Sequence, residues 1–267
     1  MNPLEIVSKT PKNNCGKCGY LTCLAFAAAV TKTGVSPGKC PFLDLTDLNL
    51  TIPEAHNLED IPRQKNLQLI EYLKSKVAVI DFSAIASPLG AQDDIQNKDA
   101  LIFQYLAQNV YLSKTDILID NKIPEDPRDQ ILLYNYVHSR GNNNPGQEWI
   151  GLESLPNTIS KVKTLAIYAE EPISRYFSNL NLEQIIKICT SLNAIEATHE
   201  NNASAGMIFP VLPKVPLYLL YWEAEPNEGF ASKTKILFRD NVLNYLDLET
   251  LVFTAERLAE RIISLAG

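Results

Sequence analysis

Apolar residues recur at steps of three and four along much of the chain, which is the spacing of one face of an α-helix. In residues 99–112, for example, Ile102, Tyr105, Leu106 and Val110 share such a face. The same pattern predicts further helices at residues 23–32, 63–75, 126–141, 182–192 and 248–262. We expect the last of these to be a long amphipathic helix.

Other stretches show the features of strands. Residues 215–223 form a nearly continuous apolar run with flanking prolines, which is typical of a buried strand, and residues 233–238 alternate between polar and apolar. We expect these two segments to pair as a hairpin. Residues 117–124 predict a short hairpin that turns at Asn121, and residues 149–152 predict a short strand. Because the last strands precede a helix without βαβ repetition, the predicted fold class is α+β, with a mixed helix and antiparallel-sheet domain.

Composition and charge suggest how the chain is divided. It has 267 residues, of which 46% are hydrophobic and 21% are charged, and these values exclude a disordered chain. The net charge is −7, but residues 1–43 hold five lysines and one glutamate, so this part carries +4 and the remainder −11. We predict an N-terminal domain at residues 1–43, a polar linker at residues 44–62 and an α+β domain at residues 63–267. The acidic balance argues against sequence-independent binding of nucleic acid, which needs a basic surface.

The sequence shows no sign of membrane insertion or export. No apolar stretch approaches the ~20 residues that span a bilayer, and the first residues lack the apolar segment of a secretory signal. We therefore expect a cytoplasmic protein without a membrane span. In a compartment where thiols stay reduced, a cluster of cysteines is more typical of a metal site than of disulfides.

Four of the five cysteines follow the spacing Cys-x2-Cys-x4-Cys-x16-Cys-Pro. A cubane [4Fe–4S] cluster needs four converging thiolates, which three closely spaced cysteines and a distant fourth can supply. Asn14, Gly16 and Gly19 suit a tight loop with exposed N–H groups. Thr22 can cap a helix that places Cys23 at its positive N-terminal end. We therefore predict that one [4Fe–4S] cluster is bound by Cys15, Cys18, Cys23 and Cys40.

Other metals remain alternatives on the spacing alone. Structural zinc sites usually have two Cys-x2-Cys knuckles, whereas this chain has one. The plant-type [2Fe–2S] order is Cys-x4-Cys-x2-Cys, which is the reverse of the order found here. Zinc, another type of cluster and the absence of a metal are therefore less favoured than a [4Fe–4S] cluster, but they stay open.

The motif at residues 11–27 (PKNNCGKCGYLTCLAFA) resembles that of a known family. It is similar to the cluster-binding motif of the corrinoid iron–sulfur protein large subunit, which is the gamma subunit of acetyl-CoA decarbonylase/synthase. It also resembles the motif in the B subunit of Rnf-type ferredoxin:NAD oxidoreductases. The resemblance implies that the four cysteines hold one [4Fe–4S] cluster. From about residue 65 the chain instead resembles an uncharacterised family with a domain of unknown function, most clearly at residues 209–222 and 236–246.

Outside the motif, the sequence offers weaker candidates. Cys189 lies on the apolar face of a predicted helix and is expected to be a buried core thiol, and His138 is expected to pack or cap near a helix end. Asp240 and Glu249 are expected to be turn or capping residues rather than a catalytic pair. Four aromatic residues that could line a pocket are expected to be core residues: Trp149, Tyr218, Tyr221 and Trp222.

These features favour an iron–sulfur protein that carries one electron at a time or acts as a redox accessory protein. The resemblance implies a link to anaerobic corrinoid or one-carbon metabolism. Expected partners are an acidic redox protein such as a ferredoxin or flavodoxin, which would match the lysine-rich domain, or a corrinoid protein. One alternative is a non-redox binding or sensor module with a structural or oxygen-sensing cluster. Another is an enzyme whose second domain performs chemistry fed by the cluster, although the sequence points to no catalytic residue.

Overall fold

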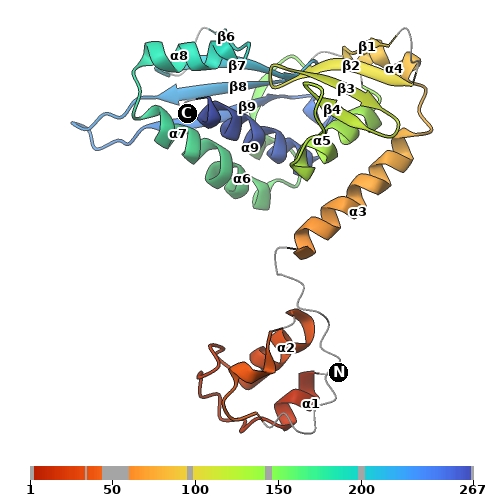
Figure 1. Ribbon diagram of the computed structural model, residues 1–267. Coiled ribbons are helices and arrows are strands. Elements are labelled where there is room, and N and C mark those ends of the chain that lie inside the picture. Colours follow the sequence, from red (N-terminus) through yellow and green to blue (C-terminus); the bar gives the residue numbers. More distant parts are fainter. Residues whose placement is uncertain are drawn as a thin grey trace. The chain divides into compact units, whose positions relative to one another are not determined.

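The computed structural model describes residues 3–33, 35–43, 60–94, 99–141, 146–197 and 202–265. The chain divides into two compact units, Met1–Leu67 and Gln68–Gly267, which we call the first and the second unit (Figure 1). Each unit has its own hydrophobic core. Most of the predicted linker at residues 44–62 lies outside the described residues, which resume with helix α3 (Asp60–Val77).

The first unit is small. Helix α1 (Pro3–Ser8) contacts helix α2 (Cys23–Thr33), and a 3-10 turn (Pro37–Lys39) follows, so the helix predicted at residues 23–32 is confirmed. The buried residues of its core are Ile6, Phe26, Ala27, Val30, Cys40 and Leu43. Folded segments below about 40 residues usually depend on a metal, disulfides or oligomerisation. All five cysteines of the chain are free thiols, so disulfides do not stabilise the first unit. A core this small is typical of a fold that a metal stabilises.

The second unit contains two antiparallel sheets. In the described residues, the first sheet has the order β1-β2-β3-β4, with β1 (Gln92–Asp93), β2 (Ala100–Tyr105), β3 (Gln108–Ser113) and β4 (Ile117–Ile119). The second sheet has the order β5-β9-β8-β7-β6, with β5 (Trp149–Gly151), β6 (Ile195–Glu196), β7 (Ala205–Leu212), β8 (Val215–Trp222) and β9 (Lys233–Arg239). The α+β fold class is therefore confirmed.

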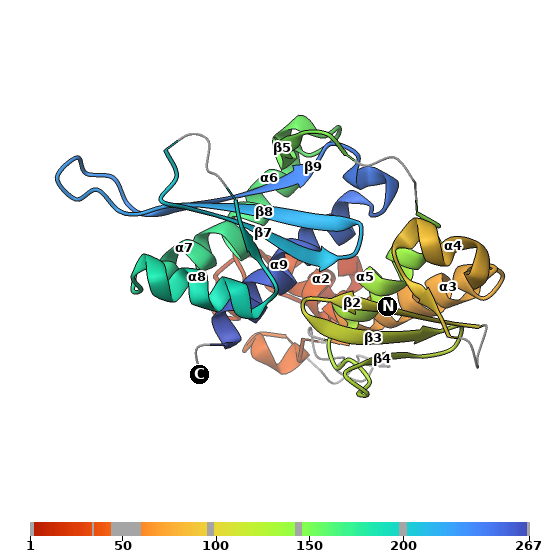
Figure 2. The same cartoon turned by 90° about the horizontal axis from the view of Figure 1, so that it is seen from above.

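Helices pack against both sheets of the second unit. They are α4 (Phe82–Leu89), α5 (Pro127–His138), α6 (Ile159–Leu165), α7 (Glu171–Phe177), α8 (Leu182–Ser191) and α9 (Leu248–Ser264), and a π-helical segment η3 (Ala166–Glu170) joins α6 to α7. Figures 1 and 2 show α6, α7 and α9 along one side of the second sheet, and the β8–β9 hairpin extending beyond the rest of the unit. None of the helices in the described part of the chain is both long and apolar enough to cross a membrane.

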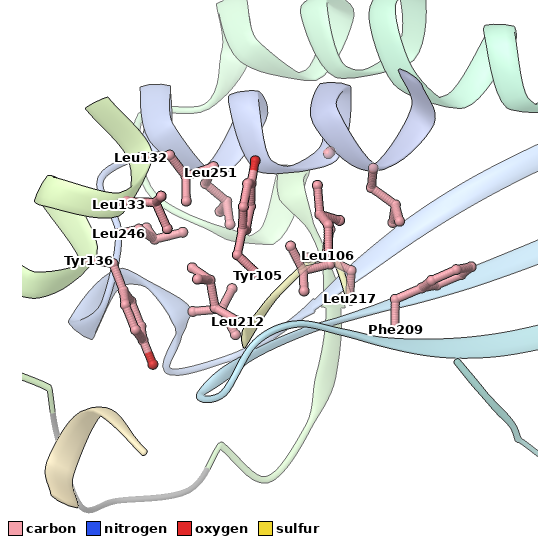
Figure 3. Close-up of a cluster of buried hydrophobic side chains, with 14 of the residues drawn as sticks. Tyr105, Leu106, Leu132, Leu133, Tyr136, Phe209, Leu212, Leu217, Leu246 and Leu251 are labelled. Atoms are coloured by element: carbon pink, nitrogen blue, oxygen red, sulfur yellow. The ribbon is translucent and has the colours of Figure 1, made fainter. Parts of the chain in front are cut away.

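The two sheets share one core. The Leu106 N–H, in the turn between β2 and β3, donates a hydrogen bond to the Val211 carbonyl of β7 at 3.0 Å. The Tyr136 hydroxyl of α5 donates to the Leu89 carbonyl at 2.6 Å and accepts from the Lys214 N–H at 3.2 Å. Figure 3 shows leucine side chains from α5, β8 and α9 meeting in this core. These links make the second unit a single folded body with an apolar interior of its own.

The prediction of a helix at residues 99–112 is wrong, because this segment forms strands β2 and β3. Leu101 and Phe103 are buried and alternate with exposed residues, as in a strand. Leu106 and Ala107 have φ angles of +49° and +62° and form a two-residue turn between paired strands. Such turns usually contain Asn, Asp or Gly, so Leu-Ala gives no turn signal. The apolar residues of the two strands coincide with helical steps, which explains the error.

Other predictions are confirmed. Strand β5, the β8–β9 hairpin and helices α3, α5, α8 and α9 lie where the sequence pattern places them. The turn near Asn121 is also confirmed, since Asp120 and Asn121 have positive φ and a bridge joins Ile119 to Lys122. The pattern missed β7, which pairs with β8, and the helices α4, α6 and α7.

Charged side chains connect α5 to α9. Asp129 on α5 is only 5% exposed, and Arg257 on α9 donates its Nε and Nη2 hydrogens to the two carboxylate oxygens, both at 2.8 Å. The Tyr105 hydroxyl, which points toward α9 in Figure 3, donates to the same carboxylate at 2.8 Å. These bonds compensate for the removal of the Asp129 charge from water.

We expect Arg257→Ala to lower the free energy of unfolding by about 3 kcal/mol, because it leaves a buried carboxylate without its counter-charge. Urea unfolding followed by far-UV circular dichroism measures this loss. The matched control is Lys161→Ala, which removes a more exposed ion pair with Glu249 and should cost less than about 1 kcal/mol. Equal losses in the two variants would contradict the structural role of the Asp129–Arg257 pair.

Candidate metal centre

The first unit contains four of the five cysteines, at different depths. Cys15 is exposed and Cys18 is half-buried, and both lie in the loop between α1 and α2. Cys23 is the first residue of α2 and is 9% exposed, and Cys40 follows the 3-10 turn and is 8% exposed. Cys23 and Cys40 are therefore buried in the unit, whereas Cys15 and Cys18 lie closer to solvent.

The cysteine loop has an unusual backbone. Lys12, Asn14, Gly16 and Gly19 all have positive φ, between +49° and +86°. The Gly19 N–H donates to the Gly16 carbonyl at 2.9 Å, which closes a tight turn around Cys18. A Cβ atom at either glycine would meet nothing within 4 Å, so it is the left-handed conformation and not crowding that favours glycine here.

Asn14 joins this loop to the start of α2. Its side-chain Oδ1 accepts a hydrogen bond from the Cys23 N–H at 2.9 Å. Thr22 caps the helix as predicted, because its Oγ1 accepts from the Ala25 N–H at 3.0 Å. The segment that carries Cys15 is thus held against the helix end that carries Cys23.

The environment of Cys23 favours its thiolate. Hydrogen bonds from the Thr10 hydroxyl and from the backbone N–H groups of Asn14 and Lys12 hold the pKa of the Cys23 thiol below its ordinary value. The N-terminal end of α2 adds a positive dipole in the same place. The thiolate is the form that binds metals, so the surroundings of Cys23 favour the form that would ligate a metal ion.

Thr10 was not recognised as a contributor to the site from the sequence, and Asn14 was predicted only as a residue of the tight loop. Thr10 is 6% exposed and lies five residues before Cys15, where no motif marks it. Only the packing of α1 against α2 brings its hydroxyl to Cys23. The φ of +49° at Asn14 is the one feature with a local signal, because asparagine tolerates the left-handed region better than most residues.

The donor chemistry of the first unit fits an iron–sulfur cluster, since it offers four free thiols, one of them with a lowered pKa. Their sulfur atoms do not converge in this structure: among the described residues, no three Cys, His, Asp or Glu side chains are gathered closely enough to hold a metal ion. The assignment of Cys15, Cys18, Cys23 and Cys40 as the ligands therefore stays a prediction.

The remaining candidates belong to the second unit and do not join one site. Cys189 is fully buried, and burial raises the pKa of its thiol to about 12. His138 is exposed in the last turn of α5. Asp240 accepts a hydrogen bond from the Gln147 N–H, and Glu249, in the first turn of α9, pairs with Lys161, so they form no catalytic pair.

The four aromatic residues lie on two faces of the second sheet and do not line one pocket. Tyr221 belongs to the main core, whereas Tyr218, Trp149 and Trp222 share a smaller cluster on the other face. The rings of Trp149 and Tyr218 contact each other in a tilted arrangement with centroids 5.3 Å apart, and the Arg239 guanidinium lies 4.0 Å above the Trp149 ring. Trp149 and Trp222 are only partly buried, so on this face the aromatic side chains cover the sheet surface without enclosing a pocket.

Residues 81–261, more than half of the chain, match the protein family described as "Domain of unknown function (DUF3786)". The chain belongs to this DUF3786 family. A second family, described as "Putative Fe-S cluster", matches residues 11–42 of this DUF3786 protein, which include all four cysteines of the motif. The predicted resemblance of the C-terminal part to an uncharacterised family is thus confirmed, and the chain is an iron–sulfur protein.

Two relatives confirm the predicted resemblance of this DUF3786 protein to the corrinoid iron–sulfur protein large subunit, while the resemblance to the Rnf B subunit stays a prediction. The acetyl-CoA decarbonylase/synthase complex subunit gamma of Archaeoglobus fulgidus is 26% identical over 137 residues, which are 50% of this chain and 26% of that protein. The corrinoid/iron-sulfur protein large subunit of Moorella thermoacetica is 48% identical over 40 residues, which are 15% of this chain and 9% of that protein. The matches thus span about a quarter of one relative's length and less of the other's. No solved structure matches the chain.

Replacing any one of Cys15, Cys18, Cys23 or Cys40 with Ser should abolish or strongly reduce cluster binding, because a cubane needs four thiolates. Iron and acid-labile sulfide, measured after anaerobic purification, report the loss. Far-UV circular dichroism should change little, since the second unit has its own core.

The matched control is Cys189→Ala, which removes the buried thiol of the second unit and should leave iron and sulfide unchanged. Full cluster content in a Cys18→Ser protein would contradict the ligand set. Loss of most secondary structure in that variant would instead show that the cluster stabilises the whole chain.

Proposed function

We propose that this protein binds one [4Fe–4S] cluster through Cys15, Cys18, Cys23 and Cys40 and acts as a one-electron carrier or redox accessory protein in the cytoplasm. The observation that supports this most is the match of residues 11–42 to an iron–sulfur family, because that segment contains the complete four-cysteine spacing. A cluster held there would accept one electron and return one electron.

The spacing supports a cubane over zinc. A structural zinc site usually takes two paired knuckles, and the chain offers a single Cys-x2-Cys pair. Three of the cysteines fall within nine residues, and the fourth is followed by Pro41, which lacks an N–H and resembles the proline after the last cysteine in other cluster motifs. Thiolates that approach from a loop, a helix start and a separate turn suit the corners of a cubane.

Charge around the cysteines supports electron transfer. Lys12 and Lys17 belong to the cysteine loop, and Lys39 precedes Cys40. A [4Fe–4S] unit with four thiolates is anionic and gains a further negative charge when reduced, so nearby lysines favour the reduced form. Residues 44–267 carry a net charge of −11, which favours the oxidised form, and salt at physiological concentration screens charges separated by more than about 8–10 Å.

The same lysines favour an acidic redox partner, such as a ferredoxin or flavodoxin. The printed names of the two relatives suggest another partner, a corrinoid protein, and hence a role in anaerobic corrinoid or one-carbon metabolism. The DUF3786 part would then dock such a partner or the molecule to be reduced.

A second candidate function is a structural or oxygen-sensing cluster without electron transfer. The small core of the first unit favours it, because one of its few buried residues is the ligand candidate Cys40. The two functions differ in one measurable property: a carrier has a cluster that can be reduced reversibly at a potential that cellular donors reach.

Anaerobically purified protein should be brown and contain about four iron and four sulfide per chain. Strong low-potential reductants should produce the electron paramagnetic resonance signal of a reduced [4Fe–4S] cluster. Near-stoichiometric zinc without sulfide after anaerobic reconstitution would end the cluster assignment. A cluster that resists reduction would favour the structural candidate.

Replacing Lys12, Lys17 and Lys39 together with Gln should slow electron exchange with a flavodoxin about 10-fold at low ionic strength and much less at high salt, because electrostatic steering is screened. Anaerobic stopped-flow absorbance follows the exchange. The matched control carries the same number of Lys→Gln changes at exposed sites of the second unit, namely Lys122, Lys163 and Lys187. Exchange that is indifferent to both salt and the first set of lysines would count against the carrier.

A further inference from the structure

Among the described residues of the first unit, three of the exposed large apolar side chains lie within two residues of a cysteine, whereas Leu4, 62% exposed, lies on α1. Leu21 is 91% exposed, Leu24 is 52% exposed and Phe42 is 48% exposed. Leu21 and Leu24 flank the segment Thr22-Cys23, and Phe42 lies two residues after Cys40. Scattered exposed leucines are ordinary on protein surfaces, but apolar groups gathered at one site mark interaction surfaces.

The exposure of Leu21 is notable because of its position. It precedes the helix cap Thr22, and an apolar residue there commonly packs against the fourth helical residue as a hydrophobic staple. That fourth residue, Phe26, is fully buried, but the ring that contacts it is Tyr20, at 5.8 Å between centroids. Tyr20 thus takes the position beside Phe26, and the side chain of Leu21 is left in solvent.

Positive charge borders these apolar groups. The Lys17 ammonium lies 5.0 Å from the centre of the Phe42 ring, which brings the cysteine loop and the segment after Cys40 together. Lys12 and Lys39 are also exposed and adjacent to the motif. In residues 3–33 and 35–43, Glu5 on α1 is the single acidic side chain. An apolar centre with a charged rim is the usual composition of a protein interface.

We propose that Leu21, Leu24 and Phe42 form the apolar centre of a docking surface for an acidic redox protein of the flavodoxin or ferredoxin class. This inference rests on the proposed function and adds the residues that make contact. Charge complementarity selects the partner, because the rim is basic and such partners are acidic. The small size of the patch suits a transient electron-transfer complex, whose interfaces are typically below about 1,200 Å². The lysines would govern encounter, and the apolar side chains would govern the lifetime of the complex.

Binding without electron transfer tests the surface. The probe is oxidised flavodoxin, titrated anaerobically into the cluster-loaded, oxidised full-length protein by isothermal titration calorimetry at low and at high ionic strength. The double variant Leu21→Ser/Leu24→Ser should raise the Kd about 10-fold, which corresponds to ~1.4 kcal/mol, at both ionic strengths. The loss should persist at high salt because burial of apolar surface is not screened.

Val79→Ser is the matched control, since Val79 is an aliphatic residue of the second unit that is 81% exposed. It should leave the Kd unchanged. Iron, sulfide and far-UV circular dichroism should be the same in all three proteins, because both leucines are at the surface. A Phe42→Ser variant provides a second measurement of the same patch and should also raise the Kd at both ionic strengths.

The outcomes separate this inference from the proposed function. A wild-type protein that binds and reduces flavodoxin, with leucine and Phe42 variants that bind equally well, overturns the docking surface and leaves the carrier intact. A wild-type protein that binds flavodoxin but has a cluster that cannot be reduced overturns the carrier while the surface stands. If the wild-type protein binds neither flavodoxin nor an acidic ferredoxin at low salt, the docking surface is wrong.

Discussion

The small apolar core of the first unit is a severe constraint, because its described residues contribute six buried side chains, and so little burial cannot offset the entropy of ordering about 40 residues. The features of the site follow from this constraint. The loop needs backbone conformations with positive φ, the hydrogen bond from the Cys23 N–H to Asn14 replaces core packing, and a thiol, Cys40, serves as part of the interior. A bound cluster would add four covalent links to such a unit, so the metal would contribute both stability and chemistry.

The second unit is stabilised in a different way, by a large hydrophobic core. Its two sheets share one apolar core, and charges that enter it are paired, as Asp129 is with Arg257. We expect it to fold without a metal because it has a large core of its own, and its candidate side chains lie on separate elements. With the proposed cluster, redox chemistry would be confined to the first unit, whereas the larger hydrophobic core belongs to the second. This division leaves a large folded surface free of the demands of cluster binding, which is what a module that contacts another protein requires.

The cysteine motif could be found from the sequence because the ligands of a cluster are spaced by local geometry over a short segment. Strand β8 and helix α9 were equally accessible, since their burial pattern is uniform along each element. Residues 99–112 failed because two strands joined by Leu106-Ala107 imitate one helical face. The role of Thr10 could not be predicted, because it depends on how α1 folds back on α2. The periodicity of apolar residues indicates which side chains are buried. It does not indicate which side chains from distant segments come together in a site.

The buried thiol of Cys189 has a consequence for how the protein ages in air. Burial raises its pKa to about 12, so the reactive thiolate hardly forms there. If oxygen dismantled the cluster, the exposed Cys15 would be open to sulfenic acid or disulfide formation, while the thiol in the second unit would stay reduced. Damage would be confined to a short, chemically reducible stretch next to an intact fold. Such a molecule could be restored by thiol reduction and renewed supply of iron and sulfide, without being synthesised again.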